Sequence, residues 1–217
     1  MALTQEDIAA AAFDLLDHVG LDGLTMRALA TRLNVQAPTL YWHVPSKQAL
    51  LDHLANALVA RAVSRIKTDD APLTVLRSVA QELRRALLEK RDGARVFAGT
   101  YVIGEHVFKL SDIALEALLK SGVNRQDAVD HMFNLIHYVS GFTIEEQALD
   151  NRWIAPDERS AVRKAFADFA DERYPTLSLC TKEILEPDFD RRFTLGVNSF
   201  LRSVDERPQG GDISDNA

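Results

Sequence analysis

A segment near the N-terminus combines positive charge with many hydrogen-bond donors. Residues 23–51 contain Arg27, Arg32 and Lys47 but no aspartate or glutamate, although the chain as a whole has a formal net charge of −7. Guanidinium, ammonium and hydroxyl groups bind phosphate oxygens, whereas a chain this acidic cannot coat a nucleic acid through bulk charge. The sequence therefore predicts a local phosphate-binding surface in this segment.

Five side chains of the segment have chemistry that suits a DNA duplex. Thr25 and Arg27 open a predicted short helix, and Lys47 opens a longer one, so these side chains and the free amides of each first turn can bind phosphates. Gln36 and Thr39 lie between them and can form hydrogen bonds with base edges. The segment is therefore expected both to anchor on the DNA backbone and to read its sequence.

The neighbours of these residues extend the same surface. Ala37 and Pro38 are small and apolar, which suits contact with a thymine methyl group, and Tyr41, Trp42 and His43 can donate hydrogen bonds to phosphates. The alternative for Tyr41 or Trp42 is burial in the core, because aromatic side chains bury large areas. Successive residues of a helix turn by about 100°, so three consecutive rings cannot all face one core. At least one of them is expected to be exposed.

Residues that start and end helices place these side chains on short helices. Thr4 and Thr25 are suited to cap helix N-termini, Asn34 ends the second helix, and Pro38 fits the first turn of the third. A long helix starts at Pro45-Ser46. The predicted helices span residues 5–18, 26–33, 37–43, 46–66, 72–91, 94–100, 105–121, 124–148, 157–171 and 188–205. With only 10 glycines and 7 prolines, the chain is expected to be all-α. The second and third helices then form a helix-turn-helix, whose second helix enters the major groove.

The overall composition indicates a globular chain without export or redox signals. It has 217 residues, 47% of them hydrophobic, and a single cysteine, Cys180, which fits a reducing cytosol. The N-terminus lacks the pattern of a signal peptide, and no apolar run reaches the ~18 residues of a membrane span. We expect a cytoplasmic protein that does not bind a membrane.

No pattern in the sequence indicates catalysis. The motifs HExxH, GxSxG, GxxxxGK[ST] and DDxxD are absent, and Cys180 lies in no nucleophile signature. His131 and His137 are six residues apart and face different sides of a helix, so they do not form a metal site. The prediction is a protein that is not an enzyme and has no cofactor or metal. A binding or sequestration protein without DNA activity is the alternative to a DNA-binding regulator.

Two helices carry apolar stripes that could join subunits. In the helix of residues 124–148 the stripe includes Val129, Phe133 and Ile136, and in that of residues 188–205 it includes Phe193 and Val197. Stripes of this kind form either a subunit interface or ordinary packing within one chain. Periodicity alone leaves both possibilities open.

The sequence resembles the TetR (tetracycline-repressor) family of regulators. The likeness is carried by TMRALA at 25–30, NVQAPTLYWHV at 34–44 and KQALL at 47–51, and it continues more weakly through RRALL at 84–88, RDGA at 91–94 and GT at 99–100. It implies a homodimer with a three-helix DNA-binding domain at residues 1–45, a larger helical domain for ligand binding and dimerisation at 46–206, and a polar tail at 207–217. The implied partners are a double-stranded DNA operator and a small-molecule inducer.

The resemblance also carries over the DNA contacts, with two departures. Nine positions fall where the family contacts its operator: Thr25, Arg27, Gln36, Pro38, Thr39, Tyr41, Trp42, His43 and Lys47. Ala37 stands in place of a glutamine that opens the recognition helix of tetracycline repressors, and Met26 stands in place of a threonine. Since an amide that reads a base is lost, the operator sequence is expected to differ.

The ligand-binding positions implied by the resemblance have lost polar groups. Val63 and Phe97 stand in place of histidines, one of them a ligand of the drug-bound magnesium, Val79 in place of an asparagine and Ala114 in place of a glutamine. The cation and the hydroxyl groups of a magnesium–tetracycline chelate would have no partners in such a site, so tetracycline is not expected to bind. The other expected lining residues are Leu83, His106, Phe108, Phe133, His137, Phe142, Glu146 and Gln147. We expect a repressor released by a small apolar or aromatic inducer, the alternative being that these phenylalanines form plain core.

Overall fold

The computed structural model describes residues 3–100, 103–150, 152–153, 155–170 and 173–206, and in this part of the chain it contains twelve helices and no strand. This confirms the predicted all-α fold. The helices are α1 Gln5–Gly23, α2 Met26–Arg32, α3 Ala37–His43, α4 Lys47–Val63, α5 Pro72–Leu88, α6 Gly93–Ala98, α7 Glu105–Lys120, α8 Arg125–Ala148, α9 Pro156–Phe169, α10 Pro175–Leu179, α11 Thr181–Leu185 and α12 Phe189–Asp205.

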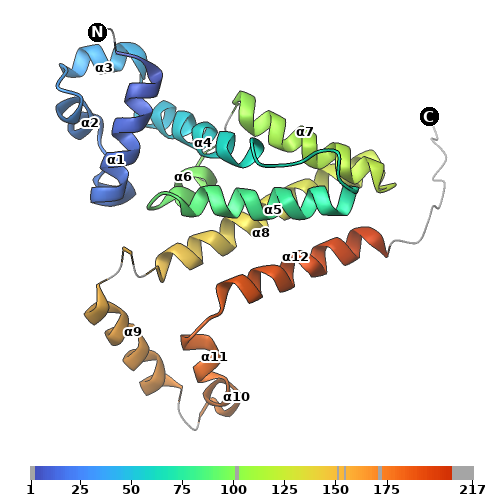
Figure 1. The fold of residues 1–217 in the computed structure, drawn as a ribbon. Coiled ribbons are helices and arrows are strands. Elements are labelled where there is room, and N and C mark those ends of the chain that lie inside the picture. The colour runs from blue at the N-terminus through green and yellow to red at the C-terminus, as the bar shows by residue number, and fades with distance from the viewer. Residues whose placement is uncertain (1–2, 101–102, 151, 154, 171–172, 207–217) are drawn as a thin grey trace, which may run out of the picture.

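Helices α1 to α3 form a separate head in Figure 1, and local hydrogen bonds cap α1, α2 and the following helix, α4. The hydroxyls of Thr4, Thr25 and Ser46 each accept a hydrogen bond from the backbone N–H three residues later, at 3.1, 3.1 and 3.0 Å. Each bond satisfies an amide that has no partner within its own helix. Asn34 ends α2 with a left-handed φ of 54°. The caps predicted at Thr4 and Thr25 are therefore confirmed.

Helix α1 is longer than predicted, because a helical turn follows a break at Gly20. The expected end at residue 18 is wrong: α1 continues to Gly23, with Gly20 at φ 70° and ψ 178°. Glycine adopts a positive φ without the steric cost that a Cβ atom brings. The break interrupts the hydrogen-bond ladder of the helix just where α1 meets the body.

Helix α4 joins the head to the body, which consists mainly of α4 to α8 (Figure 1). Helices α4, α5, α6 and α7 pack against one another, α8 covers α5, α6 and α7, and α12 lies along α5 and α8. Apolar residues of the head and the body belong to one continuous cluster, which includes Leu50 and Leu54 near the start of α4 and Leu58 further along it. A tilt of α4 would therefore displace packed side chains in the head and in the body.

Helices α9, α10 and α11 extend away from the body (Figure 1). The described side chains of α9 are exposed except that of Phe166, which is half-buried. Helices α10 and α11 were not predicted; they are only five residues long and bury no side chain. The predicted helix of residues 157–171 ends at a residue outside the described part of the chain. The predicted tail at 207–217 also lies outside it.

Candidate DNA interface and ligand region

Helix α3 exposes one face and buries the other. Leu40 and Val44 are buried against the head, whereas Trp42 is 87% exposed and Tyr41 46% exposed. His43 is half-buried. The expectation that at least one of the three consecutive rings faces solvent is confirmed, and Trp42 projects furthest from the core. An exposed indole with a free N–H suits contact with a surface outside this chain.

The first turn of α3 presents small and polar groups. Gln36 is the N-cap residue but its side chain makes no capping hydrogen bond. Ala37, Pro38 and Thr39 follow it, and all four residues are exposed. The structure thus places the predicted base-reading residues together at the exposed N-terminal end of one short helix. That end is the part of a recognition helix that contacts base edges in helix-turn-helix proteins.

The predicted phosphate anchors flank this helix, and two of them also make contacts within the chain. Thr25 and Arg27 are exposed at the start of α2, where the Thr25 oxygen also caps the helix. Lys47 is half-buried, and its ammonium donates a hydrogen bond of 3.3 Å to the carbonyl of Leu21. Thr25 and Arg27 therefore offer donors to solvent, whereas Lys47 also ties α4 to the end of α1.

Five of the predicted ligand residues belong to the buried core of the body. Val63 of α4, Val79 and Leu83 of α5, Phe97 of α6 and Ala114 of α7 are all 8% exposed or less and belong to one apolar cluster. The helices that carry them pack directly on one another. A ligand held among these residues would meet an almost wholly apolar lining.

The remaining predicted ligand residues are scattered around this cluster. Phe108 is 58% exposed and Phe133 47% exposed, and His137, exposed as well, stacks near Phe133 with ring centroids 5.9 Å apart. His106 is half-buried at the start of α7, where its backbone N–H donates to the Asn56 side chain at 3.0 Å. These residues were expected to line the ligand site together with the five above, but the structure does not bring them into the buried cluster.

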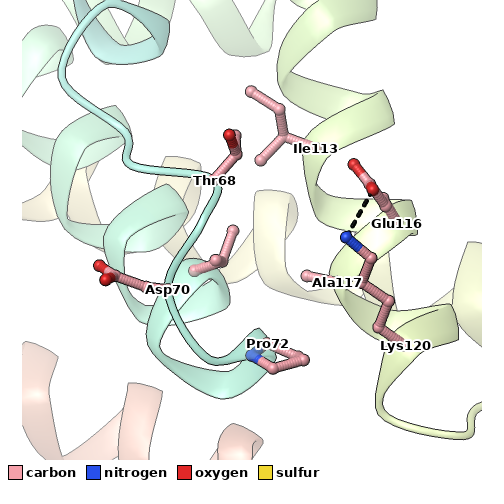
Figure 2. A pocket seen from close by; sticks show the side chains of 8 residues that line it. Thr68, Asp70, Pro72, Ile113, Glu116, Ala117 and Lys120 are labelled. Carbon is pink, nitrogen blue, oxygen red and sulfur yellow. Dashed lines mark ion pairs between the residues drawn. The ribbon is translucent and has the colours of Figure 1, made fainter.

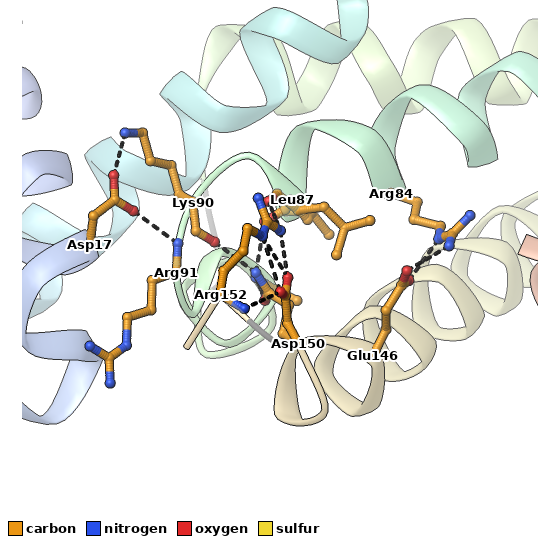
Figure 3. A network of polar contacts seen from close by, with 11 residues as sticks. Asp17, Arg84, Leu87, Lys90, Arg91, Glu146, Asp150 and Arg152 are labelled. Atoms are coloured by element: carbon orange, nitrogen blue, oxygen red, sulfur yellow. Dashed lines mark hydrogen bonds and ion pairs between the residues drawn. The ribbon is translucent and has the colours of Figure 1, made fainter. Parts of the chain in front are cut away.

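Phe142 and Glu146 belong to a polar and aromatic cluster around Arg84, which the sequence analysis did not single out. The Arg84 guanidinium donates to both carboxylate oxygens of Glu146, at 2.7 and 2.6 Å, and forms an ion pair with Asp190 at 2.7 Å. It also lies 4.7 Å from the ring centroid of Phe193. Burial lowers the pKa of Arg84, but the hydrogen bonds and charges of its two carboxylates outweigh burial and raise it. Figure 3 shows Arg84 and Glu146 facing each other from α5 and α8.

Three clefts lie around the body, and they differ greatly in size. A cavity of about 10 Å³ lies between the α4–α5 loop and α7, and it is only large enough for a water molecule. Figure 2 shows side chains that line it, among them Thr68, Asp70 and Ile113. A cleft of about 560 Å³ lies beside Arg84, between α5 and α12. A third, of about 690 Å³, lies between the end of α8 and helices α9 and α11. Of the predicted ligand residues, Glu146 lines the third cleft.

The described residues show neither a metal cluster nor a membrane helix. No group of three or more His, Cys, Asp or Glu side chains among them could hold a metal ion. Within the same part of the chain, no helix is both long enough and apolar enough to cross a bilayer.

Comparison with known proteins identifies the family. Residues 8–54 match the model of bacterial regulatory proteins of the tetR family, and residues 70–206 match the model of the tetracyclin repressor-like C-terminal domain. The chain therefore belongs to the TetR family of bacterial regulatory proteins. The tetracycline repressor protein class A from transposon 1721 of Escherichia coli is 42% identical over 151 residues, which are 69% of each chain.

Solved structures agree with this assignment. A possible TetR family transcriptional regulator from Streptomyces coelicolor A3(2) matches with a TM-score of 0.81 and 32% identity over 93% of this chain and 98% of that one. A glutamine-to-alanine variant of TetR from Acinetobacter baumannii AYE, in complex with minocycline, matches with a TM-score of 0.69 and 33% identity over 93% and 96% of the two chains. These relatives are transcriptional regulators, which confirms the resemblance and the prediction that the chain is not an enzyme.

Proposed function

We propose that this TetR-family regulator is a cytoplasmic repressor that binds a palindromic operator as a homodimer and is released by a small apolar or aromatic inducer. The observation that carries the proposal is the exposed face of α3, where Trp42 and the residues from Gln36 to Thr39 project from a head that bears no acidic side chain between residues 23 and 51. One recognition helix contacts only a few base pairs. Tight operator binding therefore needs two heads, held at a fixed separation so that each contacts one half of the palindrome.

The buried apolar cluster supports the proposed class of inducer. Val63, Val79, Leu83, Phe97 and Ala114 offer no side-chain hydrogen bond and no ligand for a cation. Each polar group of a ligand buried among them would lose its hydration without gaining a partner. An uncharged aromatic or lipid-like compound suits this lining better than a magnesium–tetracycline chelate does.

Selection of operator DNA from a random pool, followed by titration at several salt concentrations, tests the proposal. Arg27→Ala should weaken binding to all sequences and flatten the plot of log K against log salt by about 0.9 for each lost phosphate contact. Thr39→Ala should instead change the preference between sequences. Arg125→Ala, an exposed arginine at the start of α8, is the matched control and should do neither. A chain that selects no sequence from the pool would favour the sequestration alternative.

A further inference from the structure

The turn between α5 and α6 holds the head through direct polar contacts. The carboxylate of Asp17 in α1 accepts a hydrogen bond of 3.0 Å from the backbone N–H of Arg91 and forms an ion pair of 2.6 Å with the ammonium of Lys90. Figure 3 shows Asp17 reaching from α1 to both residues of the turn. The side chains of Asp17 and Lys90 are each about a quarter exposed or less, so solvent screens this pair only partly.

The break in α1 supplies a second contact of the same kind. Because Gly20 departs from helical geometry, the backbone N–H of Leu21 is free to donate to the Asp92 carboxylate, at 2.8 Å. Asp92 itself has a positive φ of 55°, which turns the chain sharply between α5 and α6. Head and body thus meet in a fixed orientation across residues 17–21 and 90–92.

Gln147 of α8 holds this turn from the other side. Its amide nitrogen donates to the carbonyls of Leu87 and Lys90, at 3.2 and 2.7 Å, and its amide oxygen accepts from the N–H of Ala94, at 3.0 Å. The residue is only 7% exposed. Both N–H groups of the amide are therefore engaged with the backbone of the turn, which leaves neither of them for a ligand.

The α5–α6 turn cannot shift far unless Gln147 moves with it. A Cβ atom added at Gly93 would lie 2.3 Å from the carbonyl oxygen of Leu87, so the two ends of the turn are in close contact. The carbonyl of Leu87 and the N–H of Ala94 have the Gln147 amide as their partner, whereas the carbonyl of Lys90 also accepts from the N–H of Gly93, at 3.0 Å. A buried polar group that loses its partner is costly, so the loss of Gln147 falls on the groups of Leu87 and Ala94. The position of α8 is in this way coupled to the turn.

We propose that Gln147 is a positioning residue for operator binding: it fixes the α5–α6 turn on α8, and the turn sets the orientation of the head through Asp17 and Leu21. This proposal rests on the proposed function, because orientation matters only if two heads must match an operator. Glu146, the neighbour of Gln147, pairs with Arg84 beside the two larger clefts. A displacement of this end of α8 would therefore reach the head through a few hydrogen bonds.

Hydrogen exchange of the full chain, measured by mass spectrometry, tests the coupling. Gln147→Met keeps the length of the side chain but removes its hydrogen bonds, and Gln126→Met, at an exposed position of the same helix, is the control. We expect amides of residues 87–94 and also of residues 17–24 to exchange about tenfold faster in Gln147→Met alone. Faster exchange confined to residues 87–94, or none at all, would overturn the proposal, because Gln147 would then serve only its own turn.

Operator affinity gives a second measure, which a merely structural role would not change. Gln147→Met should weaken binding to the selected operator by about tenfold or more, with little change in non-specific binding, which does not need a fixed spacing of heads. Equal losses for operator and non-specific DNA would contradict the proposal. If the wild-type chain selects no operator, the proposed function fails, whereas the exchange experiment still decides the coupling.

Asp17 lies at the head end of the chain of contacts that begins at Gln147, and a substitution there disturbs the core less. Asp17→Asn weakens the ion pair with Lys90 at a partly exposed site and should also lower operator affinity. Combining it with Gln147→Met should cause less further loss than the sum of the two single effects, since both act through one turn. Additive effects would show that the two residues act independently and would refute the pathway.

Discussion

Two residues of the same short helix should respond in opposite ways to truncation. Leu40 is 0% exposed in α3, whereas Trp42, two positions later, is 87% exposed. Leu40→Ala removes packed atoms from the core of the head, and Trp42→Ala removes a side chain that contacts almost nothing in its own chain. The pair therefore separates the folding of the reading head from its contact with DNA.

The burial of each side chain gives the expected magnitudes. Truncation of a buried leucine costs about 2–5 kcal/mol of stability, whereas a surface substitution usually changes it by less than about 0.5 kcal/mol. A hydrogen bond from the Trp42 indole to a phosphate would be worth about 1.5–3 kcal/mol per head. Counted over two heads, its loss should weaken operator binding on the order of 10²–10⁴-fold.

Thermal unfolding followed by circular dichroism and operator titration followed by fluorescence anisotropy measure the two effects. Trp42→Ala should keep the wild-type melting temperature and lose affinity, and Leu40→Ala should melt earlier. Leu179→Ala, which removes an 82% exposed side chain far along the sequence in α10, should change neither quantity. If Trp42→Ala melts as early as Leu40→Ala, or binds operator as well as the wild type, the exposed face of α3 is not the DNA-binding surface.

Three further outcomes follow from the structure. Gly20→Ala should lower the free energy of unfolding in urea by about 1–3 kcal/mol, because Gly20 has φ 70° and ψ 178°, a conformation that only glycine adopts readily; an unchanged midpoint would contradict this. Burial raises the pKa of Glu89, but hydrogen bonds from Arg61 and Arg65 outweigh it and lower the pKa below the ordinary value of 4.5. Glu89 therefore stabilises the fold above about pH 4.5 and loses this effect as pH falls through its lowered pKa, so Glu89→Gln should flatten the acid side of a plot of melting temperature against pH. Calorimetric titration with tetracycline and magnesium should detect no tight binding, and a tight complex would refute the apolar-inducer proposal.

The sequence predicted most reliably what neighbouring residues decide. Thr4 and Thr25 cap their helices as expected because an N-cap bond spans only three residues. That at least one of the rings at 41–43 is exposed followed from the helical rotation per residue alone. The predicted end of α1 at residue 18 was too early, because the positive φ of Gly20 kinks the chain without ending the helix.

Contacts between distant residues could not be predicted in this way. Arg84 and Glu146 are 62 positions apart, and nothing in the local pattern of either helix pairs them. Gln147 was expected to line the ligand site, and only the packing of α8 on the α5–α6 turn shows that its N–H groups instead donate to backbone carbonyls. Phe133 shared the periodicity of the core but is 47% exposed, because an apolar stripe does not reveal whether it faces its own chain or another.

The acidic residues of α1 show how an acidic chain can still present a DNA-binding surface. Asp14, Asp17 and Asp22 each form an ion pair, with Arg32, Lys90 and Arg95 respectively. These ion pairs compensate three of the five acidic charges of α1, and the other two, Glu6 and Asp7, lie in its first turn. The positive charge that the head offers to DNA is therefore confined to the acid-free segment of residues 23–51, which is the part that a phosphate backbone attracts. Lys90→Glu would leave Asp17 without its ion-pair partner and would also break the contact that holds the head, so both effects depend on one residue.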